Sequence, residues 1–192
     1  MQTHLLFFCC YIGLSLVFAE GTQTLPNYEL STLLSIKSSL IDPLDNLKDW
    51  QMPSKAIEKR SPSPHCNWTG VWCNFKGFVG KLDLSNMNLS GYVPDHIQDL
   101  HSLSSLNITC NGFSSALPKS LSNLTSLESI DVSQNYFIGN FPAGLGSSSR
   151  LTSVNASSNN FSGFLPGDLG NATSLEILDF RGSFFEGQSL HL

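Results

Sequence analysis

Apolar residues recur along the chain with a period of 24 residues from position 79 onward. Proline marks the same interval, at Pro94, Pro118, Pro142 and Pro166. Each unit opens with an apolar residue, which gives the column Val79, Leu103, Leu127, Leu151 and Leu175. The next two columns are Leu82, Leu106, Ile130, Val154 and Leu178, and Leu84, Ile108, Val132, Ala156 and Phe180. A last apolar column contains Leu89, Phe113, Phe137, Phe161 and Phe185. Self-similarity at a fixed period of this length is typical of a solenoid of stacked repeats.

The spacing inside each unit predicts one short β-strand, with apolar side chains inward and the residues between them outward. Successive strands stack in parallel, so each unit buries its apolar face only against its neighbours. We expect the phenylalanine column to form a spine. Asn111, Asn135 and Asn159 are expected to bond neighbouring backbone from a turn. Met87 and Ser183 occupy the two ends of this column, so the polar ladder should run fully only in the middle. The pattern L-x-x-L-x-L-x-x-N-x-(L/F)-x-G-x-Φ-P, where Φ is apolar, indicates a leucine-rich repeat.

A different segment precedes the repeats. Residues 27–40, NYELSTLLSIKSSL, carry apolar residues near helical spacing and predict a short amphipathic helix that ends before Pro43. Trp50 is expected in the core, and the polar, proline-bearing stretch 51–65 predicts a surface loop. We expect the cysteine loop HCNWTGVWC, with Trp68 and Trp72, to cover the open edge of the first strand, since repeat arrays need caps.

The N-terminus predicts a signal peptide over residues 1–19. Its apolar run, residues 5–18, is too short to span a bilayer comfortably, and Val17 and Ala19 supply the small residues of a cleavage site. An uncleaved anchor is the alternative, because His4 stands where a Lys or Arg is usual. Seven glycosylation sequons agree with a secretory route: Asn67, Asn88, Asn107, Asn123, Asn155, Asn160 and Asn171.

Cysteine usage then becomes simple. Cys9 and Cys10 lie in the signal peptide, and an oxidising compartment is expected to join Cys66 to Cys73. Cys110 is left over. We interpret it as a small buried residue inside a repeat, with a free reactive thiol as the alternative.

Composition excludes several classes of function. Charged residues make up 13% of the chain and the formal net charge is -5, so there is no basic footprint for nucleic acid or anionic lipid. The five histidines are scattered without metal-ligand spacing, and neither a nucleophile elbow nor a kinase motif is present. We therefore expect no enzyme, no cofactor, no metal and no membrane segment beyond the signal peptide.

The cap and repeats resemble a known class of receptors. The helix, the segments DPLDNLKDW and HCNWTGVWC, and the 24-residue repeats resemble the N-terminal cap and repeats of plant leucine-rich-repeat receptor-like kinases. LNITCNGF, LPKSL and LDFRGSFFEG resemble the peptide-hormone-sensing branch, which includes the tracheary element differentiation inhibitory factor receptor. The resemblance covers residues 27–187 and implies an α/β solenoid of plant-type repeats with a helical, disulfide-bonded cap. The expected domains are a cap over 20–78, about five repeats over 79–187 with the last incomplete, and an out-of-pattern tail over 188–192.

The fifth repeat departs from the pattern at its end. Leu190 stands where the repeat requires proline, and Ser189 replaces an apolar residue. Members of the resembled class continue with further repeats, a cysteine cap, a membrane helix and a kinase. We therefore expect a truncated receptor ectodomain whose last unit exposes an uncapped strand edge.

Ligand binding is expected on the outward columns of the concave face. Two of their residues, Asn107 and Asn155, are sequons whose glycans would obstruct the face. The candidate binding residues are Asp179, Arg181 and Gly182 in the last unit, because the resemblance implies that a peptide groove begins near there. Five strands span roughly 19 Å, whereas an extended dodecapeptide needs up to roughly 40 Å, so the fragment would hold only part of such a ligand.

Three functional hypotheses remain open. The first is the N-terminal part of a plasma-membrane receptor that senses a secreted peptide. The second is a stand-alone secreted protein, either a decoy that pairs with another leucine-rich-repeat receptor ectodomain or one that resembles polygalacturonase inhibitors. The third is a non-functional truncated product. The ligand itself cannot be identified from the repeat pattern.

Overall fold

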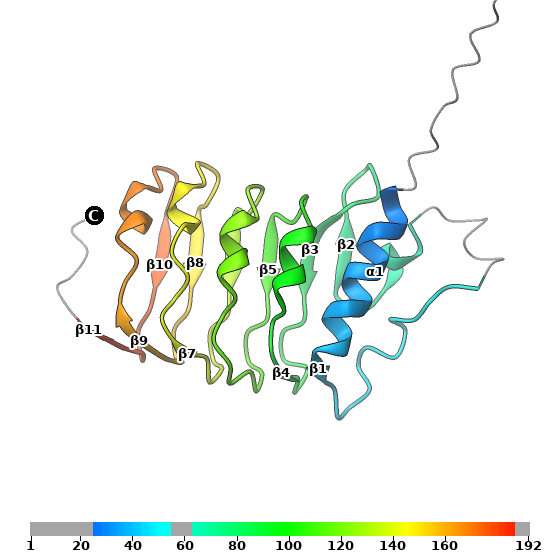
Figure 1. Ribbon diagram of the computed structural model, residues 1–192, viewed down its shortest axis with the longest axis horizontal. Helices are drawn as coiled ribbons and strands as arrows, with labels where there is room; N and C mark the ends of the chain where they lie inside the picture. Colours follow the sequence, from blue (N-terminus) through cyan, green and yellow to red (C-terminus); the bar gives the residue numbers. More distant parts are fainter. Residues whose placement is uncertain (1–24, 55–62, 187–192) are drawn as a thin grey trace, which may run out of the picture.

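The computed structural model describes residues 25–54 and 63–186. The predicted signal peptide, Gly187 and the out-of-pattern tail lie outside these residues. The described chain forms an elongated array in which a helical cap is followed by repeat after repeat along the long axis (Figure 1). Strands line one side of the array, as the solenoid prediction requires, and short helical turns line the other.

The cap contains the predicted amphipathic helix. Its elements are α1 (Leu25–Ser38), β1 (Leu40–Ile41), the 3-10 helix η1 (Pro64–Asn67) and β2 (Val71–Cys73). Leu30, Leu33 and Ile36 lie on the buried face of α1, and Trp50 is buried as predicted. The buried Glu29 links α1 to the array, because its Oε2 accepts the Val79 N–H at 2.7 Å.

The repeats supply the predicted parallel strands. These are β3 (Val79–Asp83), β5 (Ser105–Asn107), β6 (Ser129–Asp131), β8 (Ser153–Asn155) and β10 (Ile177–Asp179). They pair in register at the 24-residue period, so that Leu82 lies beside Leu106 and Ile130 beside Val154. The sheet order is β10-β8-β6-β5-β3-β2, with β2 antiparallel to β3.

The other side of the array was not anticipated from the sequence. It carries the 3-10 helices η2 (Asp95–Asp99), η3 (Lys119–Asn123), η4 (Leu145–Ser147) and η5 (Gly167–Asn171). A second set of short strands comprises β4 (Ser90–Gly91), β7 (Ile138–Gly139), β9 (Asn160–Phe164) and β11 (Phe184–Glu186). Of these, β7, β9 and β11 form a parallel sheet, whereas β4 pairs with β1 of the cap.

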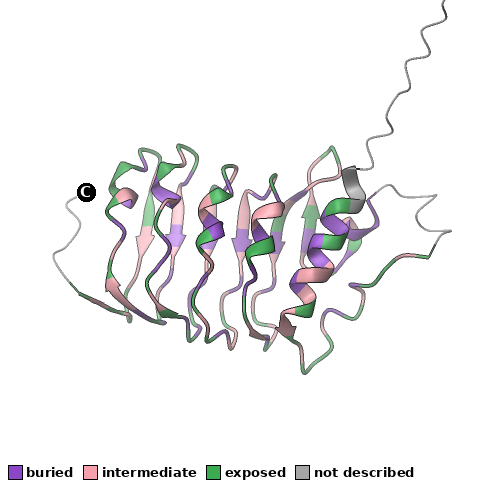
Figure 2. Ribbon diagram, viewed as in Figure 1, coloured by how far each residue is buried: buried purple, intermediate pink, exposed green. Residues whose placement is uncertain are grey.

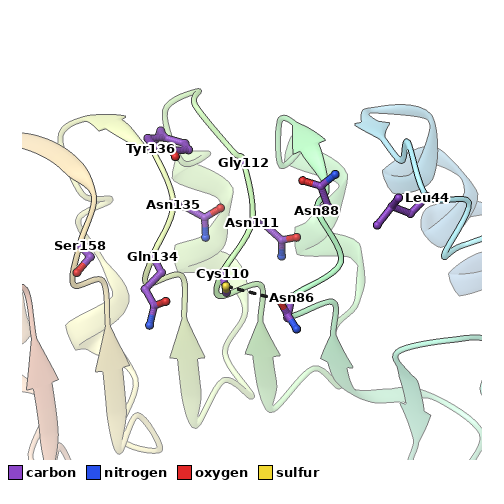
Figure 3. A pocket seen from close by; sticks show the side chains of 10 residues that line it. All are labelled: Leu44, Asn86, Asn88, Cys110, Asn111, Gly112, Gln134, Asn135, Tyr136 and Ser158. Atoms are coloured by element: carbon purple, nitrogen blue, oxygen red, sulfur yellow. Dashed lines mark hydrogen bonds between the residues drawn. The ribbon is translucent and has the colours of Figure 1, made fainter.

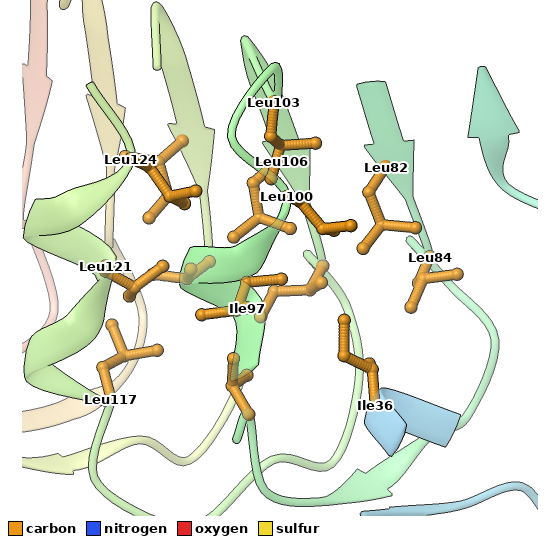
Figure 4. Packing of buried hydrophobic residues seen from close by; sticks show 14 of the residues in the cluster. Ile36, Leu82, Leu84, Ile97, Leu100, Leu103, Leu106, Leu117, Leu121 and Leu124 are labelled. Atoms are coloured by element: carbon orange, nitrogen blue, oxygen red, sulfur yellow. The ribbon is translucent and has the colours of Figure 1, made fainter. Parts of the chain in front are cut away.

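The core is a continuous layer between the two sides (Figure 2). Aliphatic side chains from strands and from 3-10 helices interdigitate there, as Leu82, Leu106, Ile97 and Leu121 illustrate in Figure 4. The predicted phenylalanine spine is confirmed. Stacked ring centroids lie 5.6 Å apart between Phe113 and Phe137, 5.9 Å between Phe137 and Phe161, and 6.1 Å between Phe161 and Phe185.

The asparagine ladder is also confirmed. The Asn135 Nδ2 donates to the carbonyls of Ile108, Val132 and Ser133 at 2.9–3.2 Å, and its Oδ1 accepts the Phe113 N–H at 3.1 Å. One buried amide therefore ties its own turn to the preceding repeat. Asn111 and Asn159 make equivalent contacts.

Packing weakens in the last described repeat. Leu151, Val154 and Phe161 are fully buried, whereas Leu175 and Leu178, which follow in the first two of these columns, are only half-buried. The ladder ends in Ser183, whose buried Oγ finds no partner among the described residues. This agrees with the prediction that the ladder is complete only in the middle.

The predicted disulfide is present, and the cysteine loop covers the edge of the first strand as expected. Cys66 and Cys73 are bonded, and the backbone of β2 itself pairs with the edge of β3. Trp68 packs into the core and stacks on Trp50, with 5.7 Å between their ring centroids. Trp72 lies opposite Lys81 of β3, within the strand that covers this edge, and its side chain is 51% exposed because it occupies the outward position of β2.

Replacing the central ladder residue tests its contribution to stability. We expect Asn135→Ala to lower the free energy of unfolding by about 3 kcal/mol, since it leaves several buried backbone groups without a hydrogen-bond partner. Chemical denaturation measures the change. Asn140→Ala, at an exposed asparagine, is the control and should stay within about 0.5 kcal/mol of wild type. A loss below about 1 kcal/mol for Asn135→Ala would contradict the ladder's role.

Removing the disulfide tests the cap. The double variant Cys66→Ala/Cys73→Ala should lose about 2.5 kcal/mol, the entropy of closing a short loop in the unfolded chain. The matched control is Cys110→Asn, which removes the third cysteine and keeps a residue that tolerates its left-handed backbone. Equal stability of the double variant and the control would exclude a structural contribution from this bond.

Candidate functional site

The outward side chains of the parallel strands, and of the residues just after them, form three columns that we call the concave face. The first column is Lys81, Ser105, Ser129, Ser153 and Ile177. The second is Asp83, Asn107, Asp131, Asn155 and Asp179. The third is Ser85, Thr109, Ser133, Ser157 and Arg181, of which Ser133 is buried beneath the face. Because the strands pair in register, each column is a straight row across the sheet.

The second column has a structural task in every repeat. In every member of this column the Oδ1 accepts the N–H of the residue two positions later, as the Asp131 Oδ1 does from Ser133 at 2.9 Å. Such side-chain turns end the strands and hold the acids and amides at a fixed angle. The row is therefore preorganised.

The predicted binding residues lie together at the far end of this face. The Arg181 guanidinium forms a two-pronged salt bridge with the Asp179 carboxylate, with Nε 2.9 Å from Oδ1 and Nη2 2.6 Å from Oδ2. This contact holds the pKa of Asp179 below its usual value. Gly182 follows with φ of 72°, in the left-handed region. The two charges thus satisfy one another, and less free charge is available here than the sequence suggests.

A second internal pair occupies the cap end. The Lys81 Nζ lies 3.3 Å from the Asp83 Oδ2 and 4.8 Å from the centre of the Trp72 ring. Burial raises the pKa of Asp83, but hydrogen bonds from Ser85 and Lys81 outweigh it and leave this pKa below its usual value. Trp72 contributes an exposed aromatic surface beside this pair.

Asp131, in the middle of the face, differs from both ends. Its Oδ1 accepts from Ser133, and its Oδ2 accepts the Asn155 Nδ2 at 3.0 Å. No salt bridge of the described residues involves Asp131. Sequence reasoning missed this residue, although a signal existed. Asp83 and Asp179 have a basic residue two positions away, whereas Asp131 has only serines.

A rim cavity of about 630 Å³ lies where the strands end (Figure 3). Its lining includes a row of left-handed residues, Asn86, Cys110, Gln134 and Ser158.

The expectation that Cys110 is buried was wrong. The φ of 57° turns its side chain outward, and the thiol is exposed with Sγ 3.7 Å from the Asn86 Oδ1. Position within the repeat, rather than the usual burial of cysteine, decides its environment.

One cluster has the residue types of a metal site, namely His65, Cys66 and Cys73. Both sulfurs are bonded to one another, so neither supplies the thiolate that a metal such as zinc requires. Chemically, the cluster is a disulfide beside a buried histidine.

The sequons divide into two groups. Those with exposed asparagines are Asn67, Asn88, Asn123, Asn160 and Asn171. Asn107 and Asn155 lie half-buried on the concave face. The Asn155 amide nitrogen donates to Asp131 and, at 3.3 Å, to the Ser133 Oγ, so it has two acceptors within the face.

No helix within residues 25–54 and 63–186 has the length and apolar character needed to cross a bilayer. Family comparison agrees with the two-part architecture. Residues 26–74 match the family described as leucine rich repeat N-terminal domain, and residues 79–137 and 150–172 match leucine rich repeat families. No kinase family matches the chain.

Relatives extend the comparison to whole proteins. MDIS1-interacting receptor like kinase 1 of Arabidopsis thaliana is 50% identical over 111 residues, which are 58% of this chain and 10% of that protein. The chain thus matches about a tenth of the first curated relatives' length.

Two crystal structures resemble this chain. The BIR2 ectodomain of Arabidopsis thaliana has a TM-score of 0.75 and 31% identity, covering 83% of this chain and 82% of that one. The Arabidopsis receptor kinase HAESA, in complex with the peptide hormone IDA and the co-receptor SERK1, gives a TM-score of 0.59 and 27% identity over 83% of this chain and 30% of that one. The chain belongs to the family of plant leucine-rich-repeat receptor-like kinase ectodomains and corresponds to their N-terminal cap and first repeats.

Proposed function

We propose that the chain is the extracellular ligand-binding module of a peptide-sensing plasma-membrane receptor-like kinase. The observation that carries the proposal is the concave face, where the middle one of three straight rows, the acids and amides, is held ready by strand-ending hydrogen bonds. Such a preorganised surface loses little entropy when a ligand binds. The catalytic step of signalling would belong to a kinase domain outside this chain.

The related structures support this choice of partner. HAESA, related at 27% identity, was crystallised with a peptide hormone and a co-receptor ectodomain. The proposed partners are therefore a secreted peptide or another leucine-rich-repeat receptor ectodomain. An extracellular location follows from the family, and we retain residues 1–19 as the signal peptide, 20–78 as the cap, 79–187 as repeats and 188–192 as the tail.

One observation favours a second candidate, a short ectodomain that pairs with other receptors. The aligned part of the chain covers 82% of the BIR2 ectodomain, so that relative's ectodomain is of similar size to this chain. The two candidates differ in ligand size, since the first captures peptides and the second captures a folded partner.

Glycan mapping tests whether the concave face is open. We expect glycans at the five exposed sequons and none at Asn107 or Asn155, because the latter are half-buried and the Asn155 amide has two hydrogen-bond acceptors within the face. Protein secreted from plant cells is digested with a glycosidase in ¹⁸O-water, and labelled sites are read by mass spectrometry. A label at Asn155 in most molecules would show that the face is covered.

Peptide capture tests the proposed function. The tagged full chain is incubated with the peptide fraction of extracellular fluid, and bound peptides are identified by mass spectrometry. Ser129→Trp places a bulky ring in the middle of the concave face and should reduce the amount of captured peptide at least tenfold. The matched control, Ser147→Trp, changes an exposed serine of η4 and should leave capture unchanged. Capture that survives Ser129→Trp would contradict the proposal, and capture of folded ectodomains alone would favour the second candidate.

A further inference from the structure

We propose that the concave face selects a ligand that places a cationic side chain over Asp131 and apolar side chains at Trp72 and Ile177. This inference rests on the proposed function and names the chemistry that the ligand must have. A short extended peptide with one Lys or Arg between two apolar residues meets the description.

The first step concerns charge. Both ends of the face carry acid–base pairs, Lys81 with Asp83 and Arg181 with Asp179, which largely cancel. Asp131 has only neutral partners, the Ser133 and Asn155 side chains and the Ser133 backbone N–H. A carboxylate with two oxygens accepts more hydrogen bonds than these, so it retains capacity for an incoming cation. The middle of the face is thus its unpaired negative point.

The second step concerns shape. Between the two ends, the first column consists of Ser105, Ser129 and Ser153, and the Ser129 Oγ donates to the Ser105 Oγ at 2.9 Å. These short side chains leave a low floor beside Asp131. Trp72 is 51% exposed at the cap end, and Ile177 is 54% exposed at the other end. An exposed aromatic and an exposed aliphatic residue thus bracket a polar floor, an arrangement that accommodates two apolar anchors.

The third step concerns spacing. Trp72 lies on β2, three strands from Asp131 on β6, and Ile177 lies on β10, two strands beyond. At about 4.8 Å between strands, these separations are roughly 14 Å and 10 Å. An extended chain advances about 3.3 Å per residue, so the cation follows one apolar residue by about four positions and precedes the other by about three. The octapeptide LSSSRSSL has this spacing.

The neighbouring groups do not compete for the ligand's cation. Asn107 and Asn155 flank Asp131 on the adjacent strands and are neutral. The acids Asp83 and Asp179 each lie two strands away, roughly 10 Å, and are paired with Lys81 and Arg181. Discrimination between a basic and an acidic ligand therefore falls on Asp131.

The test uses the full chain and two fluorescein-labelled probes, LSSSRSSL and LSSSESSL, with affinities measured by fluorescence anisotropy. We expect the arginine peptide to bind at least fivefold more tightly than the glutamate peptide. Asp131→Asn should reduce this ratio below twofold, while Asp131→Glu should preserve it. Asp95→Asn removes an equal charge from an exposed position on η2 and should leave the ratio unchanged. Thermal melts establish that each variant is folded.

A further variant separates the apolar anchors from the charge. Ile177→Ser should weaken both probes by the same factor, because it removes an anchor and leaves Asp131 intact. Equal affinity for the two probes, or a ratio that persists in Asp131→Asn, would overturn the inference. Absence of saturable binding by the arginine probe would overturn it too. If Ser129→Trp still abolished capture of extracellular peptides, the proposed function would stand and only the ligand chemistry would fail.

Discussion

The structure depends on one buried carboxamide in each interior repeat. Asn135 donates to three carbonyls and accepts one N–H, and in doing so it joins two successive turns beside the stacked rings of Phe113 and Phe137. A buried amide left without partners is costly, so the turn has a single favourable arrangement. Repetition of this bond at Asn111 and Asn159 gives every interior repeat the same turn and the same rise.

The regular rise determines the surface. Because the strands pair at a constant register of 24 residues, outward side chains fall into straight rows, and chemistry on the concave face is set by composition along each row. The strand-ending acids and amides of the second row then serve two purposes at once. Asp83 and Asp179, which have a basic residue two positions away, form salt bridges with it. Asp131, which lies between serines, forms none with the described residues and is therefore the acid that we propose binds a ligand's cation.

The sequence predicted the parts of the fold that follow from period and alternation: the strands, the phenylalanine spine, the asparagine ladder, the cap helix and the disulfide. It did not reveal β4 and β7, because two-residue strands such as Ile138–Gly139 leave no alternation to read. The 3-10 helix η3 was equally invisible, since five residues are too few for a helical period. Cys110 was misplaced because residue type was weighed above position in the repeat. The pairing of Asp179 with Arg181 depends on side-chain conformations that spacing alone does not give.

Amide hydrogen exchange followed by NMR tests the ladder most directly. The N–H groups of Phe113 and Phe137 donate to the Oδ1 atoms of Asn135 and Asn159, and the account predicts that they exchange only through global unfolding. The Phe180 N–H, whose counterparts in earlier repeats donate to the next strand, has no acceptor among the described residues and should exchange orders of magnitude faster. Exchange of Phe137 at a rate near that of Phe180 would contradict the view that the buried asparagines hold the repeats together.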